Sequence, residues 1–304
     1  MIYLSLCIPT NGIEEWVIPV LERIYVQNVE HTLWEVVITD NGGNEEFEKR
    51  MSSYAKQKTN LLYKKTDAYM FENQIEALKL ANGEYLKFVN HRFLLEPGSI
   101  QWMIDLIKDN ISDKPVIYLS NGVLKMPRRE EMNFDSFVRK LGQYASWTTG
   151  VGVWKTDFEK IPYDHIYNKI SPHSDVLFSE RKKLRYIIDD RIWSKEIDTN
   201  HSKKGCYDLY KAFGCEELTI TLNLFIDGDI SAETFKSVKK SYEKCLSGFY
   251  LDFNILKKPC SYFINGFHDA MGIFFDERKI IFLAYMRLLY RIIKHPIKKI
   301  RGNK

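Results

Sequence analysis

The chain has 304 residues, of which 45% are hydrophobic and 28% are charged, and this balance excludes a disordered protein and allows one large domain or two smaller ones. The formal net charge is only +4, so the composition does not indicate a nucleic-acid-binding protein. The five cysteines are odd in number and lack Cys-x-x-Cys spacing, which argues against a disulfide framework or a zinc site and favours a cytoplasmic protein.

The first hundred residues alternate between strand-like and helix-like patterns. Short apolar or β-branched runs predict strands at 3–8, 34–39, 60–63 and 85–89. Helices are expected at 14–26, 45–58 and 71–80, and Asn82-Gly83 is expected to end the last one through positive φ. Strands that alternate with helices indicate a mostly parallel sheet with helices on both faces. Pro9 interrupts the first apolar run, which has no basic leader, so we expect no signal peptide.

Polar segments follow directly after three of the predicted strands. They are Pro9-Thr10-Asn11, Asp40-Asn41 and Asn90-His91-Arg92. Ligands of parallel α/β sheets bind at the carboxyl ends of the strands. We therefore expect the three segments to converge on one rim of the sheet and to form the ligand site there.

The middle of the chain continues the pattern, with strands expected at 116–119, 150–154 and 184–188 and a helix at 100–109. From about Ala232 the pattern becomes helical, and Ser231 is the expected N-cap. We therefore divide the chain into an α/β domain at 1–204 and a mainly helical region at 205–304.

The C-terminal segment 278–304 is basic. No acidic residue follows Glu277, whereas nine basic residues do: Arg278, Lys279, Arg287, Arg291, Lys294, Lys298, Lys299, Arg301 and Lys304. Two interpretations remain open, a basic amphipathic helix that lies on an anionic membrane and a last helix that packs on the core. The apolar run at 280–293 is interrupted by Arg287 and Arg291, so we expect no transmembrane helix.

Three sequence blocks stand out in order along the first hundred residues. They are Ile8-Pro9-Thr10-Asn11, Val37-Ile38-Thr39-Asp40-Asn41-Gly42, and the run from Glu72-Asn73 to Glu84-Tyr85 with Leu94-Leu95-Glu96-Pro97-Gly98 downstream. Together these blocks resemble the family 2 glycosyltransferases, in particular bacterial enzymes of surface-polysaccharide synthesis. The resemblance covers about Leu4 to Trp193. It implies an α/β fold of the GT-A type, which is Rossmann-like with a mostly parallel sheet flanked by helices, here followed by a helical C-terminal region.

The family resemblance implies a reaction and a set of contacts. A sugar would pass from a nucleotide-diphosphate donor to a hydroxyl of a surface glycan or lipid-linked saccharide, usually with inversion. Pro9, Thr10 and Asn11 would line the nucleotide site, and Asp40 would accept a hydrogen bond from a pyrimidine imide N–H. Asn41 would lie beside Asp40, and Asn73 would lie near the ribose or the sugar.

The family's Asp-x-Asp motif falls on Asn90-His91-Arg92, where the pattern fails. Asp-x-Asp normally holds a divalent cation that neutralises the leaving diphosphate. Our hypothesis is that Arg92, together with His91 and Lys65, stabilises the phosphates instead, because arginine can bind phosphate through two hydrogen bonds. No metal ligands are assigned, and whether Mg²⁺ or Mn²⁺ binds through other residues is left open.

The expected catalytic base is Asp175. In the resembling family the base lies between a glycine-rich strand and another short strand, and the segment Pro172-His173-Ser174-Asp175 lies between the strands expected at 150–154 and 184–188. Asp175 would deprotonate the acceptor hydroxyl. The acid that usually precedes the base is absent, so Asp189, Asp190 and His173 remain alternatives.

Each of these assignments has a structural alternative. Asp40-Asn41-Gly42-Gly43 could be only a turn, Asn73 a helix-surface residue, and Asp175 a helix cap. At the level of function, the missing Asp-x-Asp also favours a non-catalytic GT-A module that binds a partner or nucleotide without turnover. A nucleotidyltransferase would need a glycine-rich phosphate loop and acidic metal ligands, and the Thr10-Asn11-Gly12 turn is too short for such a loop.

Overall fold

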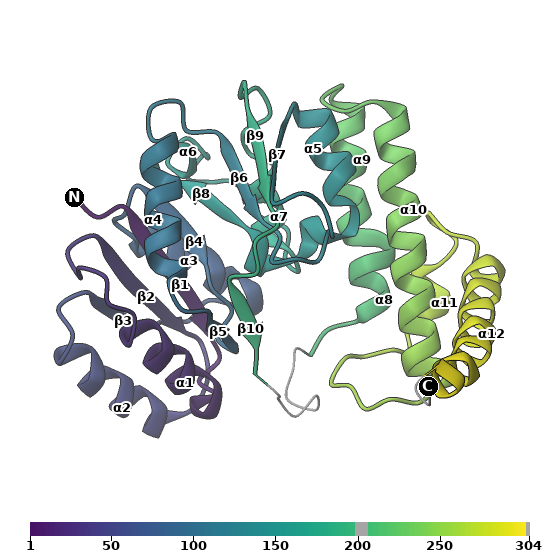
Figure 1. The fold of residues 1–304 in the computed structure, drawn as a ribbon, viewed down its shortest axis with the longest axis horizontal. Coiled ribbons are helices and arrows are strands. Elements are labelled where there is room, and N and C mark those ends of the chain that lie inside the picture. Colours follow the sequence, from purple (N-terminus) through teal and green to yellow (C-terminus); the bar gives the residue numbers. More distant parts are fainter. Residues whose placement is uncertain (198–205, 302–304) are drawn as a thin grey trace. The chain divides into compact units, whose positions relative to one another are not determined.

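The computed structural model of the protein describes residues 1–197 and 206–301, with side chains described as far as Lys294. The chain divides into two compact units, Met1–Asp198 (unit 1) and Thr199–Lys304 (unit 2). In Figure 1 unit 1 runs from purple to teal and unit 2 from green to yellow.

Unit 1 alternates strands and helices, as the sequence pattern predicts. Its strands are β1 (Leu4–Thr10), β2 (Trp34–Asp40), β3 (Leu61–Lys65), β4 (Tyr85–Phe88), β5 (Phe93–Leu95), β6 (Val116–Leu119), β7 (Arg129–Met132), β8 (Gly152–Trp154), β9 (Tyr186–Asp189) and β10 (Ser194–Glu196). Its α-helices are α1 (Glu14–Tyr25), α2 (Glu45–Lys56), α3 (Asn73–Leu80), α4 (Ser99–Asn110), α5 (Phe134–Leu141), α6 (Lys155–Phe158) and α7 (Pro172–Leu177).

The main sheet has five strands in the order β3-β2-β1-β4-β8. β1 is parallel to β2 and β4, and β2 is parallel to β3, whereas β8 runs antiparallel to β4. A second sheet has the order β6-β9-β7, and β10 pairs with β5. The predicted mostly parallel sheet is therefore confirmed, and antiparallel strands occur at its edge and in the smaller sheets.

Strand β1 shows why helices cover both faces of the main sheet. Side chains alternate between the faces of a strand. Leu4, Leu6 and Ile8 are fully buried in a core cluster that includes residues of α1 and α4. Cys7 points to the opposite face, where its Sγ lies 3.8 Å from the carbonyl oxygen of Ala77 in α3.

The end of α3 differs from the prediction. Neither Asn82 nor Gly83 has positive φ, and Ala81 ends the helix in an extended conformation. Gly83 is required by a close approach instead, because a Cβ there would lie 2.7 Å from Ser5 Oγ and 2.8 Å from Ser5 N. The missing side chain lets the chain enter β4 directly beside β1.

Unit 2 is helical. Its helices are α8 (Leu209–Lys211), α9 (Glu217–Ile226), α10 (Ala232–Phe249), α11 (Phe267–Ala270) and α12 (Glu277–Arg301), with π-helical segments at Ala212–Glu216 and Tyr250–Ile255. Ser231 Oγ accepts a hydrogen bond from Thr234 N at 3.2 Å, which confirms the predicted N-cap. Helical structure begins at Leu209, earlier than expected. Among the described residues, no helix has the length and apolar character needed to cross a membrane.

Candidate functional site

The three polar segments meet at the carboxyl end of the parallel strands, as predicted. Thr10 and Asp40 are register partners at the ends of β1 and β2. His91, in the loop after β4, has its Nδ1 2.9 Å from Thr10 Oγ1. Asn41 N also donates to the carbonyl oxygen of Thr10 at 3.2 Å. We call this place, where the loops after β1, β2 and β4 touch, the rim.

The loops after β1 and β2 are packed so closely that one position excludes any side chain. A Cβ on Gly42 would lie 1.9 Å from the carbonyl oxygen of Asn11, so only glycine fits there. Pro9 is partly buried next to Thr10, and Asn11 is exposed at the rim. The turn at Asn11 is therefore held in place by backbone contact and presents its side chain to solvent.

Asp40 is fully buried, and its carboxylate is already hydrogen-bonded within the protein. Its Oδ1 accepts from Gly42 N at 2.8 Å, and its Oδ2 accepts from Tyr63 Oη at 2.9 Å and Lys65 Nζ at 3.3 Å. Lys65 Nζ also donates to the carbonyl oxygen of Gly42. Burial and the hydrogen bond to Asp40 both raise the pKa of Tyr63. A nucleotide base would have to share or displace one of these donors, and the base contact of Asp40 stays a prediction.

The side-chain amides of Asn73 and Asn41 hold the backbone at the rim through hydrogen bonds. Asn73 is buried, and its Nδ2 donates to the carbonyl oxygens of Thr10 at 3.1 Å and Thr39 at 2.9 Å. Its Oδ1 accepts from Thr66 Oγ1 at 2.8 Å. The amide thus fastens the ends of β1 and β2 to the start of α3. Asn41 Nδ2 donates in the same way to two carbonyl oxygens of the 68–70 loop, each at 2.9 Å.

His91 is a neutral hydrogen-bond donor at the rim. Burial and the nearby Arg92 lower the pKa of His91 to about 3. Thr10 Oγ1 accepts from Gly12 N at 3.2 Å and can donate its own proton to His91 Nδ1. In the tautomer with that hydrogen bond, the ring proton lies on Nε2. The imidazole also packs edge-on against Trp16, with ring centroids 5.1 Å apart. These contacts fix the ring while leaving one N–H to donate.

Arg92 carries the permanent positive charge of the loop. Its Nε donates to Glu196 Oε1 at 2.9 Å, and its guanidinium carbon lies 5.9 Å from the Trp16 ring centroid. Glu196 is brought there by β10, which pairs it with Phe93 of β5. Arg92 is held by this ion pair with its side chain 19% exposed. A diphosphate would therefore compete with the carboxylate of Glu196 for the guanidinium.

The chemistry of Asn90-His91-Arg92 does not fit a divalent cation. Mg²⁺ and Mn²⁺ bind through carboxylate and other oxygen ligands, but this segment contains no carboxylate and one fixed cation. Asn90 Oδ1 accepts from Arg92 N at 3.2 Å, so its oxygen already closes a turn. No three His, Cys, Asp or Glu side chains gather into a metal-binding group anywhere in the described parts of the chain.

Asp175 and His173 lie on α7 and have different surroundings. Asp175 is partly buried, accepts a hydrogen bond from Asn168 N, and has its pKa raised mainly by burial. A raised pKa suits a carboxylate that must take up a proton. His173 is buried, donates from Nε2 to the carbonyl oxygen of Ser146 at 2.8 Å, and lies 3.0 Å from Gln74 Oε1. The His173–Gln74 contact ties α7 to α3, the helix that begins at the rim.

The alternative bases Asp189 and Asp190 hold loops together. Asp189 is fully buried and pairs with Arg129 Nε at 3.2 Å. Asp190 accepts from Ser120 Oγ at 2.6 Å and from the backbone N–H groups of Leu124 and Met126 at 3.3 and 3.1 Å. Asp189 is thus bound to β7, and Asp190 is bound to the loop after β6.

Sequence reasoning missed three residues at or near the rim. Trp16 and Glu196 contact His91 and Arg92 from distant parts of the sequence, with no local motif. Lys87 is fully buried in β4, and its Nζ donates to the carbonyl oxygens of Phe88 at 3.1 Å, Val151 at 2.9 Å and Thr149. Burial lowers its pKa. The sequence offered one sign of this arrangement, because Lys87 is the only charged residue in the apolar run Tyr85-Leu86-Lys87-Phe88-Val89.

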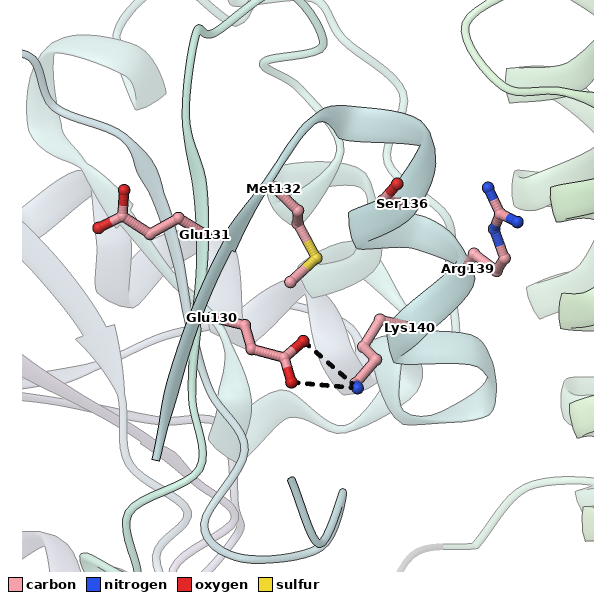
Figure 2. Close-up of a pocket in the computed structure, with 6 residues that line it drawn as sticks. All are labelled: Glu130, Glu131, Met132, Ser136, Arg139 and Lys140. Atoms are coloured by element: carbon pink, nitrogen blue, oxygen red, sulfur yellow. Dashed lines mark hydrogen bonds and ion pairs between the residues drawn. The ribbon is translucent and has the colours of Figure 1, made fainter. Parts of the chain in front are cut away.

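An open hollow on unit 1 is separate from the rim residues. Figure 2 shows it between β7 and α5, with Glu130 and Lys140 pointing toward one another across it at 3.4 Å. Its lining residues are Glu130, Glu131, Met132, Ser136, Arg139 and Lys140. None of these residues is a predicted site residue, and the side chains that face each other carry opposite charges. We assign the hollow no part in the candidate site.

Comparisons with known proteins show the family and the fold. Residues 5–163, more than half of the chain, match the profile of glycosyl transferase family 2. No curated protein matches the chain. The structure of Staphylococcus aureus TarS 1–349 in complex with UDP-GlcNAc has a TM-score of 0.61 at 14% identity, over 94% of this chain and 88% of that one.

Two further TarS structures are similar. The complex of TarS 1–349 with UDP has a TM-score of 0.54 at 15% identity, over 90% of this chain and 76% of that one. A longer TarS structure has a TM-score of 0.54 at 14% identity, over 82% of this chain and 44% of that one. At such identities the likeness establishes the GT-A fold.

Proposed function

The chain belongs to glycosyl transferase family 2, and we propose that this glycosyltransferase moves a sugar from a uridine-diphosphate sugar to an acceptor hydroxyl without a metal ion at Asn90-His91-Arg92. The proposed acceptor is a surface glycan or a lipid-linked saccharide, and the proposed compartment is the cytoplasm. The observation that carries the proposal is the meeting of Thr10, Asp40 and the His91 loop at one rim. The uridine donor is suggested by the UDP-GlcNAc and UDP complexes of TarS.

In the proposed reaction the acceptor oxygen attacks the anomeric carbon while Asp175 takes the hydroxyl proton. The bond between the anomeric carbon and the diphosphate oxygen breaks with inversion, and the leaving diphosphate carries the charge away. Arg92 and the Nε2–H of His91 stabilise that charge. This assignment is supported by the fixed cation of Arg92 and by the neutral state of His91, whose pKa of about 3 leaves the ring as a donor near neutral pH.

Glu196 and Lys65 would move when the donor binds. The guanidinium of Arg92 exchanges the carboxylate of Glu196 for phosphate oxygens, and Lys65 exchanges the carboxylate of Asp40 for the diphosphate. The second exchange also frees one lone pair of Asp40 for a uracil N–H. Support comes from the exposure of the Lys65 side chain, 33%, which leaves its ammonium accessible to a diphosphate at the rim.

Release of UDP from a panel of UDP-sugars in the presence of EDTA tests the proposal. We expect turnover by the wild type, faster with the true acceptor, and a loss of about a hundredfold or more in kcat for Asp175→Asn. UDP affinity should stay unchanged in that variant, because Asp175 acts on the acceptor. Glu180→Asn is the matched control on the neighbouring segment.

The second candidate function is a GT-A module that binds a nucleotide or partner without turnover. The observation that favours it is the closed environment of Asp40, whose carboxylate has three donors within the protein. UDP binding by the wild type without turnover of any UDP-sugar would support this candidate over the enzyme. A turnover that requires Mg²⁺ or Mn²⁺ would instead contradict the proposed metal-free reaction and the role of Arg92 in it, but not the transfer of a sugar.

A further inference from the structure

One face of α12 is apolar and exposed. Ile280 and Ala284 on the inner side are fully buried in unit 2, where α12 packs on α10. The outer side carries residues spaced by three and four, which places them on one helix face. These residues, each between 47% and 63% exposed, are Phe282, Tyr285, Met286, Leu289, Tyr290, Ile292 and Ile293. We call them the α12 stripe.

Contacts within unit 2 fix the direction of the stripe. Arg291 Nη1 lies 2.9 Å from Asp252 Oδ1. Together with the buried Ile280 and Ala284, this ion pair holds the inner side of α12 against the unit. The stripe therefore faces away from its own unit, because the opposite side of the helix is the one that packs.

The charge of the same segment is entirely positive after its first residue. Glu277 begins α12, and the nine basic residues that follow have no acidic neighbour in sequence. Lys294 lies at the margin of the stripe, with its Nζ 5.1 Å from the ring centroid of Tyr290. An apolar face with Lys294 at its margin, in a segment that has no acidic residue after Glu277, complements a surface that is apolar inside and anionic outside.

We propose that α12 lies in the interface of an anionic lipid bilayer, with the α12 stripe in the acyl region and Lys294, at the margin of the stripe, at the lipid phosphates. This is the arrangement of interfacial amphipathic helices. Within the described residues no helix can span a bilayer, so the contact is peripheral. Self-pairing of α12 is disfavoured because it would bring two acid-free basic segments together.

Co-sedimentation with vesicles tests the proposal on the full chain. We expect binding to phosphatidylcholine vesicles with about 30% phosphatidylglycerol to exceed binding to pure phosphatidylcholine by about tenfold. Raising NaCl from about 0.1 M to about 0.5 M should weaken it, because the basic residues are screened. The double variant Leu289→Glu/Ile293→Glu should lose most of the binding.

The matched control is Ile226→Glu/Ile273→Glu. It changes two exposed isoleucines of unit 2, at 68% and 64% exposure, outside the stripe, and should bind like the wild type. The milder pair Leu289→Ser/Ile293→Ser serves if the charged pair fails to fold by circular dichroism. Absence of binding to anionic vesicles would overturn the proposal. Equal binding by stripe and control variants would also overturn it, as would a stripe-dependent dimer that does not bind vesicles.

Discussion

The family resemblance predicts that Arg92 occupies the position of the family's acidic metal-binding motif, and Glu196 pairs with Arg92 at 2.9 Å. A carboxylate beside the proposed phosphate ligand has two effects. It orients the guanidinium over Trp16, and it competes with an incoming diphosphate for the same N–H groups. The competing effect gives Glu196 a measurable influence on nucleotide affinity.

We predict that Glu196→Gln raises the affinity for UDP in EDTA by about threefold to fivefold. The Glu196 side chain is 39% exposed, and exposed ion pairs contribute up to about 1 kcal/mol. Calorimetric titration measures the change. Glu76→Gln, which removes an exposed partner of Lys79, should leave the affinity unchanged. Weaker UDP binding by Glu196→Gln would contradict this prediction. It would show that Glu196 holds Arg92 in position for UDP rather than competing with UDP for the guanidinium.

We predict that the stability of unit 1 depends on pH because His173 is buried and has a lowered pKa. Burial lowers its pKa to about 4, whereas an unfolded histidine titrates near about 6.5. Between these values the unfolded state binds the extra proton, so the free energy of unfolding falls as pH falls, by about 1.4 kcal/mol per unit at most.

Urea unfolding followed by tryptophan fluorescence tests this at pH 7 and pH 5, because all six tryptophans lie in unit 1. The loss of stability between the two pH values should shrink in His173→Gln. It should persist in His165→Gln, since His165 is exposed. An unchanged pH dependence in His173→Gln would contradict the assignment of a buried neutral ring.

At the rim, the sequence predicted which residues meet wherever the order and direction of the strands alone determine it. Thr10 and Asp40 end parallel strands and His91 follows one, so their meeting could be predicted from the strand pattern. The partners of these residues could not, because Tyr63 and Glu196 reach Asp40 and Arg92 through strand register rather than through a local motif. The binding and catalytic roles assigned from the family resemblance stay predictions.

The end of α3 shows how an element can be predicted for the wrong reason. Asn82-Gly83 predicted a helix end by positive φ, and the helix does end before it. Glycine is needed at position 83 for a steric reason instead, since Gly83 packs against the backbone of Ser5. A sequence shows that a glycine is present, but it does not show which neighbour would collide with a side chain.

We predict that Gly83→Ala destabilises unit 1 by about 1–3 kcal/mol, because the added Cβ must push β1 and β4 apart. Gly43→Ala is the matched control, since a Cβ at Gly43 has no atom within 4 Å. Urea unfolding by tryptophan fluorescence measures both. Equal stability of the two variants would contradict the close approach at Ser5.

Short strands set the limit of element prediction in this chain. The strands β5, β7 and β10 have only three or four residues each and were not predicted. The equally short strands β6 and β8 were predicted because they are apolar, whereas β7 (Arg-Glu-Glu-Met) and β10 (Ser-Lys-Glu) are mostly charged and show no apolar pattern. Yet β10 delivers Glu196 to Arg92. The long strands β1 and β2 and the helices α1 and α2 were predictable because their apolar patterns extend over seven or more residues.

At the scale of the whole molecule, the family profile and the proposed nucleotide site belong to unit 1, whereas the α12 stripe belongs to unit 2. The two proposals therefore rest on different residues and can fail separately. A loss of vesicle binding in the stripe variant should leave UDP affinity unchanged, and a loss of UDP binding in an Arg92 variant should leave vesicle binding unchanged. The central claim is that Arg92 takes the place of a metal ion in unit 1.

Calorimetric titration of UDP into the wild type and Arg92→Ala, each with EDTA and with Mg²⁺ or Mn²⁺, tests that claim most directly. We predict the same wild-type affinity with EDTA as with either metal. We also predict about tenfold to a hundredfold weaker binding in Arg92→Ala, because a hydrogen-bonded charge is lost. Wild-type binding that requires a metal, or an Arg92→Ala variant that binds as tightly as the wild type, would contradict it.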